Sequence, residues 1–189
     1  MRYQAVVIGV SAGGMAALNT ILPELPGDFP LSVLIVQHTH PTSDDFLARY
    51  LDEQCRVTVK EADEKEKILP GIVYLAPPNY HLLVETDKTL SLSTELPVNY
   101  ARPSIDVMFE TAADAYGETV VGVILTGANH DGSRGLLTIK KAGGFTVVQD
   151  PETAEADAMP RSAIETAAPD RILPLEQIGP FLSGLVFDS

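Results

Sequence analysis

The chain has 189 residues and a formal net charge of −13 at pH 7, with 26 acidic against 13 basic side chains. This length predicts one domain over residues 1–189 with a substantial core. The acidic balance argues against nucleic acid as a main partner, because phosphate binding needs a basic face.

The sequence shows neither an apolar run of bilayer length nor the pattern of a secretory signal. The single cysteine, Cys55, cannot form an internal disulfide and is expected to be a buried, unreactive thiol. We therefore expect a cytoplasmic protein without membrane insertion.

Strand-like and helix-like segments alternate along the chain. Continuous apolar runs at residues 31–37 and 119–125 are typical of strands buried on both faces. Thr42 or Ser43 is expected to cap one helix and Ser104 another. The expected strands are residues 3–8, 31–37, 56–61, 71–75, 80–85, 89–93, 119–125, 145–149 and 171–173. The expected helices are residues 13–21, 43–54, 105–117, 133–142, 161–167 and 176–186.

This order predicts an α/β protein with a doubly wound, mostly parallel sheet and helices on both faces. Residues 80–85 and 89–93 predict an antiparallel hairpin addition. In such sheets, ligands and catalytic groups gather at the carboxyl ends of the strands. Reactive side chains that follow the strands are therefore the candidates for a site.

The first strand runs into a glycine-rich turn that contains Ser11 and precedes a helix. Helix amino ends stabilise negative charge, so this hydroxyl could be a nucleophile or could bind an anion. The turn has neither the lysine of a P-loop nor the spacing G-x-G-x-x-G. Its glycines could also serve only to pack the helix against the sheet.

Two more strand ends carry reactive groups: His38 follows one apolar strand and Asp131 follows another. Attack by Ser11 on an acyl carbon needs an imidazole to take its proton and a carboxylate to orient that imidazole. His38 could instead be structural, and Asp131 could cap the following helix. The three strand-end groups together favour catalysis, in a chain order that differs from the α/β-hydrolases.

The other histidines leave alternatives open. His40 could compete with His38 for the role of base, His81 could line the same rim, and His130 adjoins Asp131. No tight metal-ligand spacing such as H-E-x-x-H occurs, so no metal is expected. Acyl transfer by a serine, a histidine and a carboxylate requires no organic cofactor either.

Three segments of the chain resemble the active-site segments of the chemotaxis receptor methylesterase family, the CheB catalytic domain. They are I-G-V-S-A-G-G at residues 8–14, V-Q-H at 36–38 and L-T-G-x-x-x-D-G at 125–132. Residues 75–82, 102–106, 142–150 and 158–164 also match, so the resemblance covers nearly the whole chain.

The resemblance implies hydrolysis of glutamate γ-methyl esters on chemoreceptor cytoplasmic helices, with release of methanol, and deamidation of particular receptor glutamines. Ser11 would be the nucleophile, His38 the general base and Asp131 its orienting carboxylate. The implied partners are the methylated receptor cytoplasmic domain and, separately, a receiver-domain regulator or a methyltransferase.

A tetrahedral oxyanion needs preorganised donors, typically backbone N–H groups. The N–H of Ala128 is the foremost candidate, together with that of Ala12. Arg102 is expected either at the rim, where it would pair with acidic groups beside the target side chain, or in a structural salt bridge.

The chain departs from the family pattern in two respects. The usual regulator has an N-terminal receiver domain, whereas this chain begins at the first catalytic strand, so we expect a stand-alone form. Where the family commonly has G-M-G-N-D-G, this chain has Ala128, Asn129 and His130 in place of the M-G-N. Because Asn129 replaces a glycine, a positive φ there would be harder to hold.

Two alternatives to the methylesterase follow. The altered loop at residues 127–131 would suit a degenerate module that binds a receptor or partner without turnover. The chain could also be an esterase that acts on another partner in a hybrid signalling system outside chemotaxis.

Overall fold

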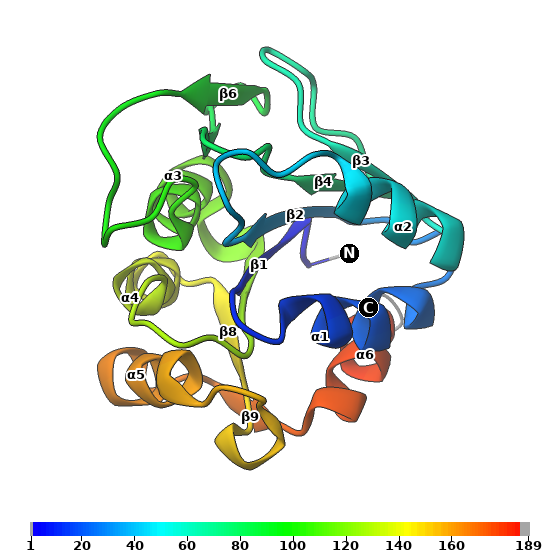
Figure 1. Cartoon of the computed structure of the whole chain (residues 1–189). Helices are drawn as coiled ribbons and strands as arrows, with labels where there is room; N and C mark the ends of the chain where they lie inside the picture. The colour runs from blue at the N-terminus through cyan, green and yellow to red at the C-terminus, as the bar shows by residue number, and fades with distance from the viewer. Residues whose placement is uncertain (1, 186–189) are drawn as a thin grey trace.

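A computed structural model of the chain describes residues 2–185 (Figure 1). Its centre is a seven-stranded sheet in the order β3-β4-β2-β1-β7-β8-β9, in which every neighbouring pair is parallel. The strands are β1 (Ala5–Val10), β2 (Ser32–Gln37), β3 (Thr58–Glu61), β4 (Ile72–Leu75), β7 (Val120–Ile124), β8 (Phe145–Gln149) and β9 (Arg171–Leu173).

Helices cover both faces of the sheet, as predicted (Figure 1). Alternating side chains of β1 point to opposite faces. Val6, Ile8 and Val10 enter one core cluster, and Ala5 and Val7 enter the other. One face carries α1 (Gly14–Ile21), α2 (Phe46–Gln54) and α6 (Leu175–Gly184); the other carries α3 (Ile105–Tyr116), α4 (Ser133–Lys141) and α5 (Ala158–Ala167). Short 3₁₀ turns lie at Leu22–Glu24, Gly117–Thr119 and Pro151–Thr153.

The predicted hairpin is confirmed, but it forms a separate two-stranded sheet. Its antiparallel strands are β5 (His81–Val84) and β6 (Leu90–Ser93). The buried side chains of Leu82, Val84 and Leu90 belong to the core cluster of α3, so the hairpin packs against that helix.

Some helix boundaries differ from the predictions. Neither Thr42 nor Ser43 caps α2, which begins at Phe46 after Asp45. Helix α5 begins at Ala158, before the predicted start at residue 161. Pro160 can lie in the first turn of the helix because the N–H groups of that turn have no partner within the helix. The predicted end of the last helix, Val186, lies outside the described residues.

The order of the sheet places a topological switch point at β1. The chain continues from β1 to β2 on one side and later returns to pair β7 on the other side of β1. Ligand sites in open α/β sheets form where the strand order reverses, outside the carboxyl ends of the strands. Over residues 2–185, no helix is long and apolar enough to cross a membrane.

Candidate active site

Ser11 follows β1 at the switch point, in a turn held by both neighbouring strands. Its N–H donates to Thr126 O at 2.9 Å, and its carbonyl accepts from the N–H of Gly14 at 2.9 Å and from Gln37 Nε2 at 3.0 Å. Gly13 has φ 78°, and a Cβ on Gly14 would collide with the Gln37 amide. The turn therefore requires its glycines.

His38 follows β2 and meets Asp131 across the site. Its Nε2 lies 2.8 Å from Asp131 Oδ2. An ionised carboxylate only accepts hydrogen bonds, so Nε2 carries the ring proton of the neutral histidine and Nδ1 is an acceptor. Asn129 Nδ2 lies 3.0 Å from that Nδ1. In the described part of the chain Ser11 Oγ makes no hydrogen bond, although Ser11 and His38 line the same hollows.

Asp131 is fully buried, with 0% of its surface exposed. Burial alone would raise the pKa of this carboxyl, but hydrogen bonds from His38 and several other donors hold the pKa below its ordinary value. Asp131 is therefore ionised at neutral pH. The other donors are Ser104 Oγ at 2.8 Å, Asn99 Nδ2 at 2.9 Å, Ile105 N at 2.6 Å and Asp106 N at 3.2 Å.

The sequence left open that Asp131 caps the helix that follows it, α4, and this alternative is wrong. Asp131 instead accepts the first N–H groups of α3. Ser104 precedes α3 as predicted, but its hydroxyl bonds Asp131 and makes no cap bond. Asp106 in turn accepts from the N–H of Gly135 in the first turn of α4 at 2.7 Å. Asn99 Nδ2 joins the two carboxylates, lying 2.8 Å from Asp106 Oδ2.

The sequence predictions missed Asn99 and Asp106 as residues that support the site. The only signal for Asp106 was its place in the stretch 102–106 that resembles the family. Burial raises the pKa of Asp106, and the neighbouring Asp131 charge raises it further. The starts of α3 and α4 thus bring the carboxylates of Asp106 and Asp131 together, and that of Asp131 faces His38.

Arg102 lines a hollow at the site, but its guanidinium is engaged within the protein. It donates to Asn79 Oδ1 at 2.7 and 3.1 Å and to the carbonyls of Thr94 and Glu95 at 2.8 and 3.0 Å. The predicted alternative of a structural salt bridge is wrong, since no acid pairs with Arg102 in the described residues. Arg102 fixes the loop between β6 and α3 at the rim.

The backbone N–H groups of Ala12 and Ala128 make no hydrogen bond within residues 2–185. Both residues are exposed, and Ala12 lines the larger hollow. Asn129 is not in the left-handed region, so its replacement of a glycine carries no backbone strain. His130 is exposed.

The remaining histidines serve other purposes. His40 is exposed and bonds Thr42 Oγ1 at 2.9 Å, away from Asp131. His81 does not line the rim, since it is 2% exposed. Its Nε2 lies 3.1 Å from Leu96 O, and its Nδ1 accepts the backbone N–H of Ser104 at 3.1 Å.

Cys55, expected to be buried, is half-buried at the end of α2. Burial, with a smaller contribution from the Asp52 charge, raises the pKa of the thiol to about 11. Thiolate is therefore scarce at neutral pH, as expected for an unreactive cysteine.

Two hollows open at Ser11 and His38. The larger, of about 750 Å³, also contains Ala12, Tyr50 and Glu155. The smaller, of about 380 Å³, also contains Asn99, Arg102 and Asn129. Together they offer room for a side chain beside the hydroxyl and the imidazole.

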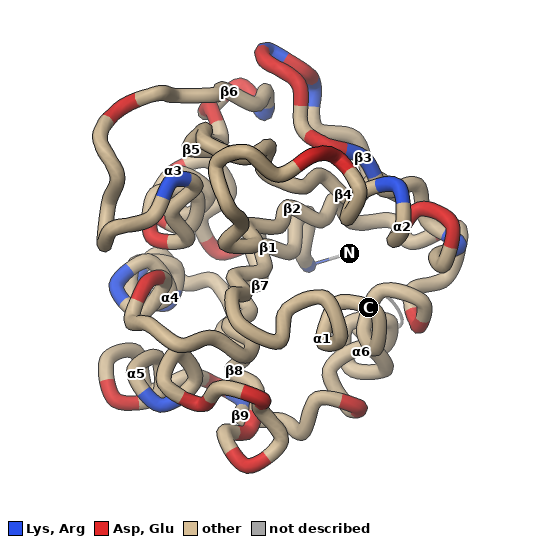
Figure 2. Tube along the Cα trace, in the orientation of Figure 1, with Lys and Arg blue, Asp and Glu red and all other residues tan. Residues whose placement is uncertain are grey.

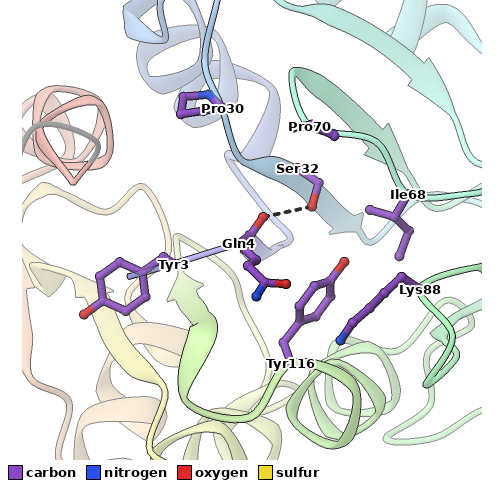
Figure 3. Close-up of a pocket in the computed structure, with 8 residues that line it drawn as sticks. All are labelled: Tyr3, Gln4, Pro30, Ser32, Ile68, Pro70, Lys88 and Tyr116. Carbon is purple, nitrogen blue, oxygen red and sulfur yellow. Dashed lines mark hydrogen bonds between the residues drawn. The ribbon is translucent and has the colours of Figure 1, made fainter. Parts of the chain in front are cut away.

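A further cavity of about 360 Å³ lies at the opposite, amino-terminal edge of the sheet (Figure 3). Its lining includes Ser32, Lys88 and Tyr116. Lys88 Nζ lies 3.8 Å from the centre of the Tyr116 ring and also bonds Ala115 O, so the ammonium is already engaged. No hydrogen bond joins a hydroxyl of this lining to the Lys88 amine within residues 2–185, whereas Ser11 and His38 line common hollows at the carboxyl edge, which is the candidate active site.

The fold and the site define a doubly wound α/β protein that places a serine, a histidine and a buried aspartate at its switch point. Residues 6–182 match the CheB methylesterase family. The chain belongs to this family, as the resemblance of its sequence motifs predicted.

Individual relatives agree with this assignment. A putative protein-glutamate methylesterase/protein-glutamine glutaminase of Leptospira interrogans is 57% identical over 178 residues, covering 94% of this chain and 92% of that protein. A protein-glutamate methylesterase/protein-glutamine glutaminase of Symbiobacterium thermophilum is 41% identical over 92% of this chain, which spans 48% of that longer protein.

A solved structure is similar over the whole fold. The crystal structure of the Thermotoga maritima CheB methylesterase catalytic domain has a TM-score of 0.94 and 37% identity, and the match covers 98% of this chain and 100% of that one.

Proposed function

We propose that the protein is a protein-glutamate methylesterase in which Ser11 is the nucleophile, His38 the general base and Asp131 the carboxylate that orients it. The observation that carries this proposal is the contact of 2.8 Å between the buried, ionised Asp131 and Nε2 of His38, a histidine that lines the same hollows as Ser11. That contact sets the tautomer in which Nδ1 can accept a proton. The names of the relatives support the same activity.

In the proposed reaction, Ser11 Oγ attacks the γ-carbonyl carbon of a glutamate methyl ester while His38 Nδ1 takes the hydroxyl proton. The tetrahedral intermediate collapses, the bond to methoxide breaks, and His38 returns the proton so that methanol leaves. Water then hydrolyses the acyl-enzyme by the same base, which restores the glutamate and frees Ser11. With a glutamine side chain the leaving group is ammonia, so one route serves both reactions.

The unpaired N–H groups of Ala12 and Ala128 support their proposed role as oxyanion donors. Loss of one such donor typically costs about 3 kcal/mol of transition-state stabilisation. The amino end of α1 also faces the turn and favours negative charge there. Arg102 supplies a positive charge at the rim for an acidic receptor segment, and its hydrogen bonds hold it in place.

The proposed substrate is the methylated cytoplasmic domain of a chemoreceptor, with a separate receiver-domain regulator or methyltransferase as further partners. A second candidate, a module that binds without turnover, is favoured by one observation: Asn129 and not Ser11 occupies His38 Nδ1.

The test is release of methanol from a methylated receptor fragment. Ser11→Ala should abolish release while the circular dichroism spectrum stays native. Ser91→Ala, in the hairpin strand β6, is the matched control and should keep wild-type activity. Methanol release that survives in Ser11→Ala would refute the triad, and a wild-type protein that binds the fragment without release would establish the binding module.

A further inference from the structure

The side chain of Asn129 has a defined orientation at the base. Its Oδ1 accepts the backbone N–H of Asp131 at 3.0 Å. Because a backbone N–H can only donate, the amide oxygen must face Asp131 and the amide nitrogen must face His38. The contact of 3.0 Å between Asn129 Nδ2 and His38 Nδ1 is therefore a hydrogen bond donated to the ring.

This hydrogen bond occupies the lone pair that the reaction needs. A neutral imidazole has one accepting nitrogen, and here Nε2 is committed to Asp131. Ser11 Oγ–H and Asn129 Nδ2–H therefore compete for the single lone pair of Nδ1. The amide cannot accept a proton, so Ser11 is not activated while Asn129 holds that position.

We propose that Asn129 is a positioning residue that keeps the base nitrogen of His38 occupied in the empty site. Entry of a side-chain carbonyl, as in a glutamate ester or a glutamine, draws the amide N–H to the carbonyl oxygen and opens Nδ1 to the Ser11 hydroxyl. The proton of Ser11 then passes to Nδ1 and on to the leaving group. This inference rests on the proposed function and adds a restraint on Ser11 before substrate binds.

The test measures the reactivity of Ser11 in the empty site with a small fluorophosphonate. The Ser11 oxygen bonds phosphorus, fluoride leaves, and the serine proton is taken up by His38 and released to solvent. Asn129→Ser keeps a hydroxyl that can accept the Asp131 N–H in a local turn but is too short to reach His38. We expect it to label roughly two- to tenfold faster, which is the range for the net effect of one neutral hydrogen bond.

Ser91→Ala is again the control. Ser91 lies in the hairpin strand β6, outside both hollows, and bonds neither His38 nor Asp131. Its labelling rate should equal that of the wild type. Asn129→Thr offers the same short acceptor and replaces Asn129→Ser if that variant does not fold.

A spectroscopic readout separates this role from a purely structural one. In ¹⁵N spectra of the imidazole, Asn129→Ser should move the His38 Nδ1 resonance toward that of an unbonded acceptor. The Nε2 resonance, set by Asp131, should stay in place. A residue that only stabilised the loop would change the melting temperature without this selective shift.

The outcomes distinguish the two proposals. Equal or slower labelling in a folded Asn129→Ser variant overturns the role of Asn129, and an unmoved Nδ1 resonance does the same. If Ser11-dependent methanol release persists in that case, the proposed function stands. If the probe labels Ser11 in none of the folded proteins, the nucleophile assignment falls and the role of Asn129 falls with it.

Discussion

Asp131 connects the candidate site to the start of a helix, because its carboxylate contacts both His38 and the first residues of α3. The same carboxylate that faces His38 accepts the first N–H groups of α3 and the Ser104 hydroxyl, and no part of it is exposed. A typical helix is capped by a residue directly before it, whereas α3 is capped by a group from a distant loop. The orientation of the proposed catalytic carboxylate is thus determined by the start of a helix.

Asp131→Asn is expected to lose both activity and stability. An amide has one accepting oxygen, so its NH₂ group would face buried donors that the carboxylate now satisfies. Each unmet buried donor costs about 1–3 kcal/mol, and kcat should fall about 10⁴-fold from the wrong tautomer. Urea denaturation and methanol release measure the two effects. Ser11→Ala is the control, and equal stability of the two variants would contradict the structural role.

The lowered pKa of Asp131 also makes the stability of the fold depend on pH in the acid range. A carboxyl whose pKa is lower when folded stabilises the fold above its unfolded pKa of about 3.9, and this contribution is lost as pH falls through the folded pKa. The raised pKa of Asp106 acts in the opposite sense, because its ionisation opposes folding as pH rises. The stability of the wild type should therefore fall as the pH drops below about 4, and the stability of Asp131→Asn should fall less over the same range.

At the scale of elements, α3 and α4 are held together by an exchange of caps. Asp131, before α4, caps α3, and Asp106, in α3, bonds the N–H of Gly135 in α4. This exchange needs a close approach of the two helices at Gly135. A Cβ there would lie 2.5 Å from Phe109 Cβ and 3.1 Å from the Asp106 backbone.

Gly135→Ala is expected to destabilise the protein, although alanine is the better helix former by about 1 kcal/mol. Overpacking against a helix backbone typically costs about 1–3 kcal/mol, which outweighs that gain. Gly184→Ala in α6 is the matched control, because an added Cβ there meets nothing within 4 Å. Thermal unfolding should show a lower midpoint for Gly135→Ala alone. A higher midpoint for Gly135→Ala would mean that α3 and α4 can move apart without loss of stability.

Element boundaries show where local sequence signals were insufficient. The strands were predicted well because buried β1, β2 and β7 are apolar on both faces. The predicted start of α2 was wrong because Asp45, which precedes the helix, is as good a cap by type as Thr42 or Ser43. For α3, the cap was placed at Ser104, whose hydroxyl instead bonds Asp131.

At the scale of the whole molecule, the net charge of −13 is expected to oppose the approach of an acidic partner. Figure 2 shows acidic residues spread over many elements, with basic residues among them. Glu155 lines the larger hollow, while Arg102 lines the smaller one. An acidic receptor segment would therefore meet repulsion from most of the surface and attraction near Arg102.

If the receptor segment is acidic, added salt should raise kcat/KM, because screening weakens the overall repulsion. The range from about 10 mM to 150 mM shortens the Debye length from roughly 30 to 8 Å. A small neutral ester is the control substrate and should show little dependence on salt. A fall in kcat/KM with salt would show that attraction near Arg102 dominates encounter.

The sequence by itself determined the alternating elements, the doubly wound fold and the three strand ends that carry Ser11, His38 and Asp131. These features follow from local periodicity and from the rule that parallel strands end at one edge. Only the tertiary structure decided that Asp131 caps α3, that Asn99 joins it to Asp106, and that Asn129 occupies the base nitrogen. The physical reason is that a buried polar group takes whichever donors the packed helices bring to it, and those donors come from distant parts of the chain.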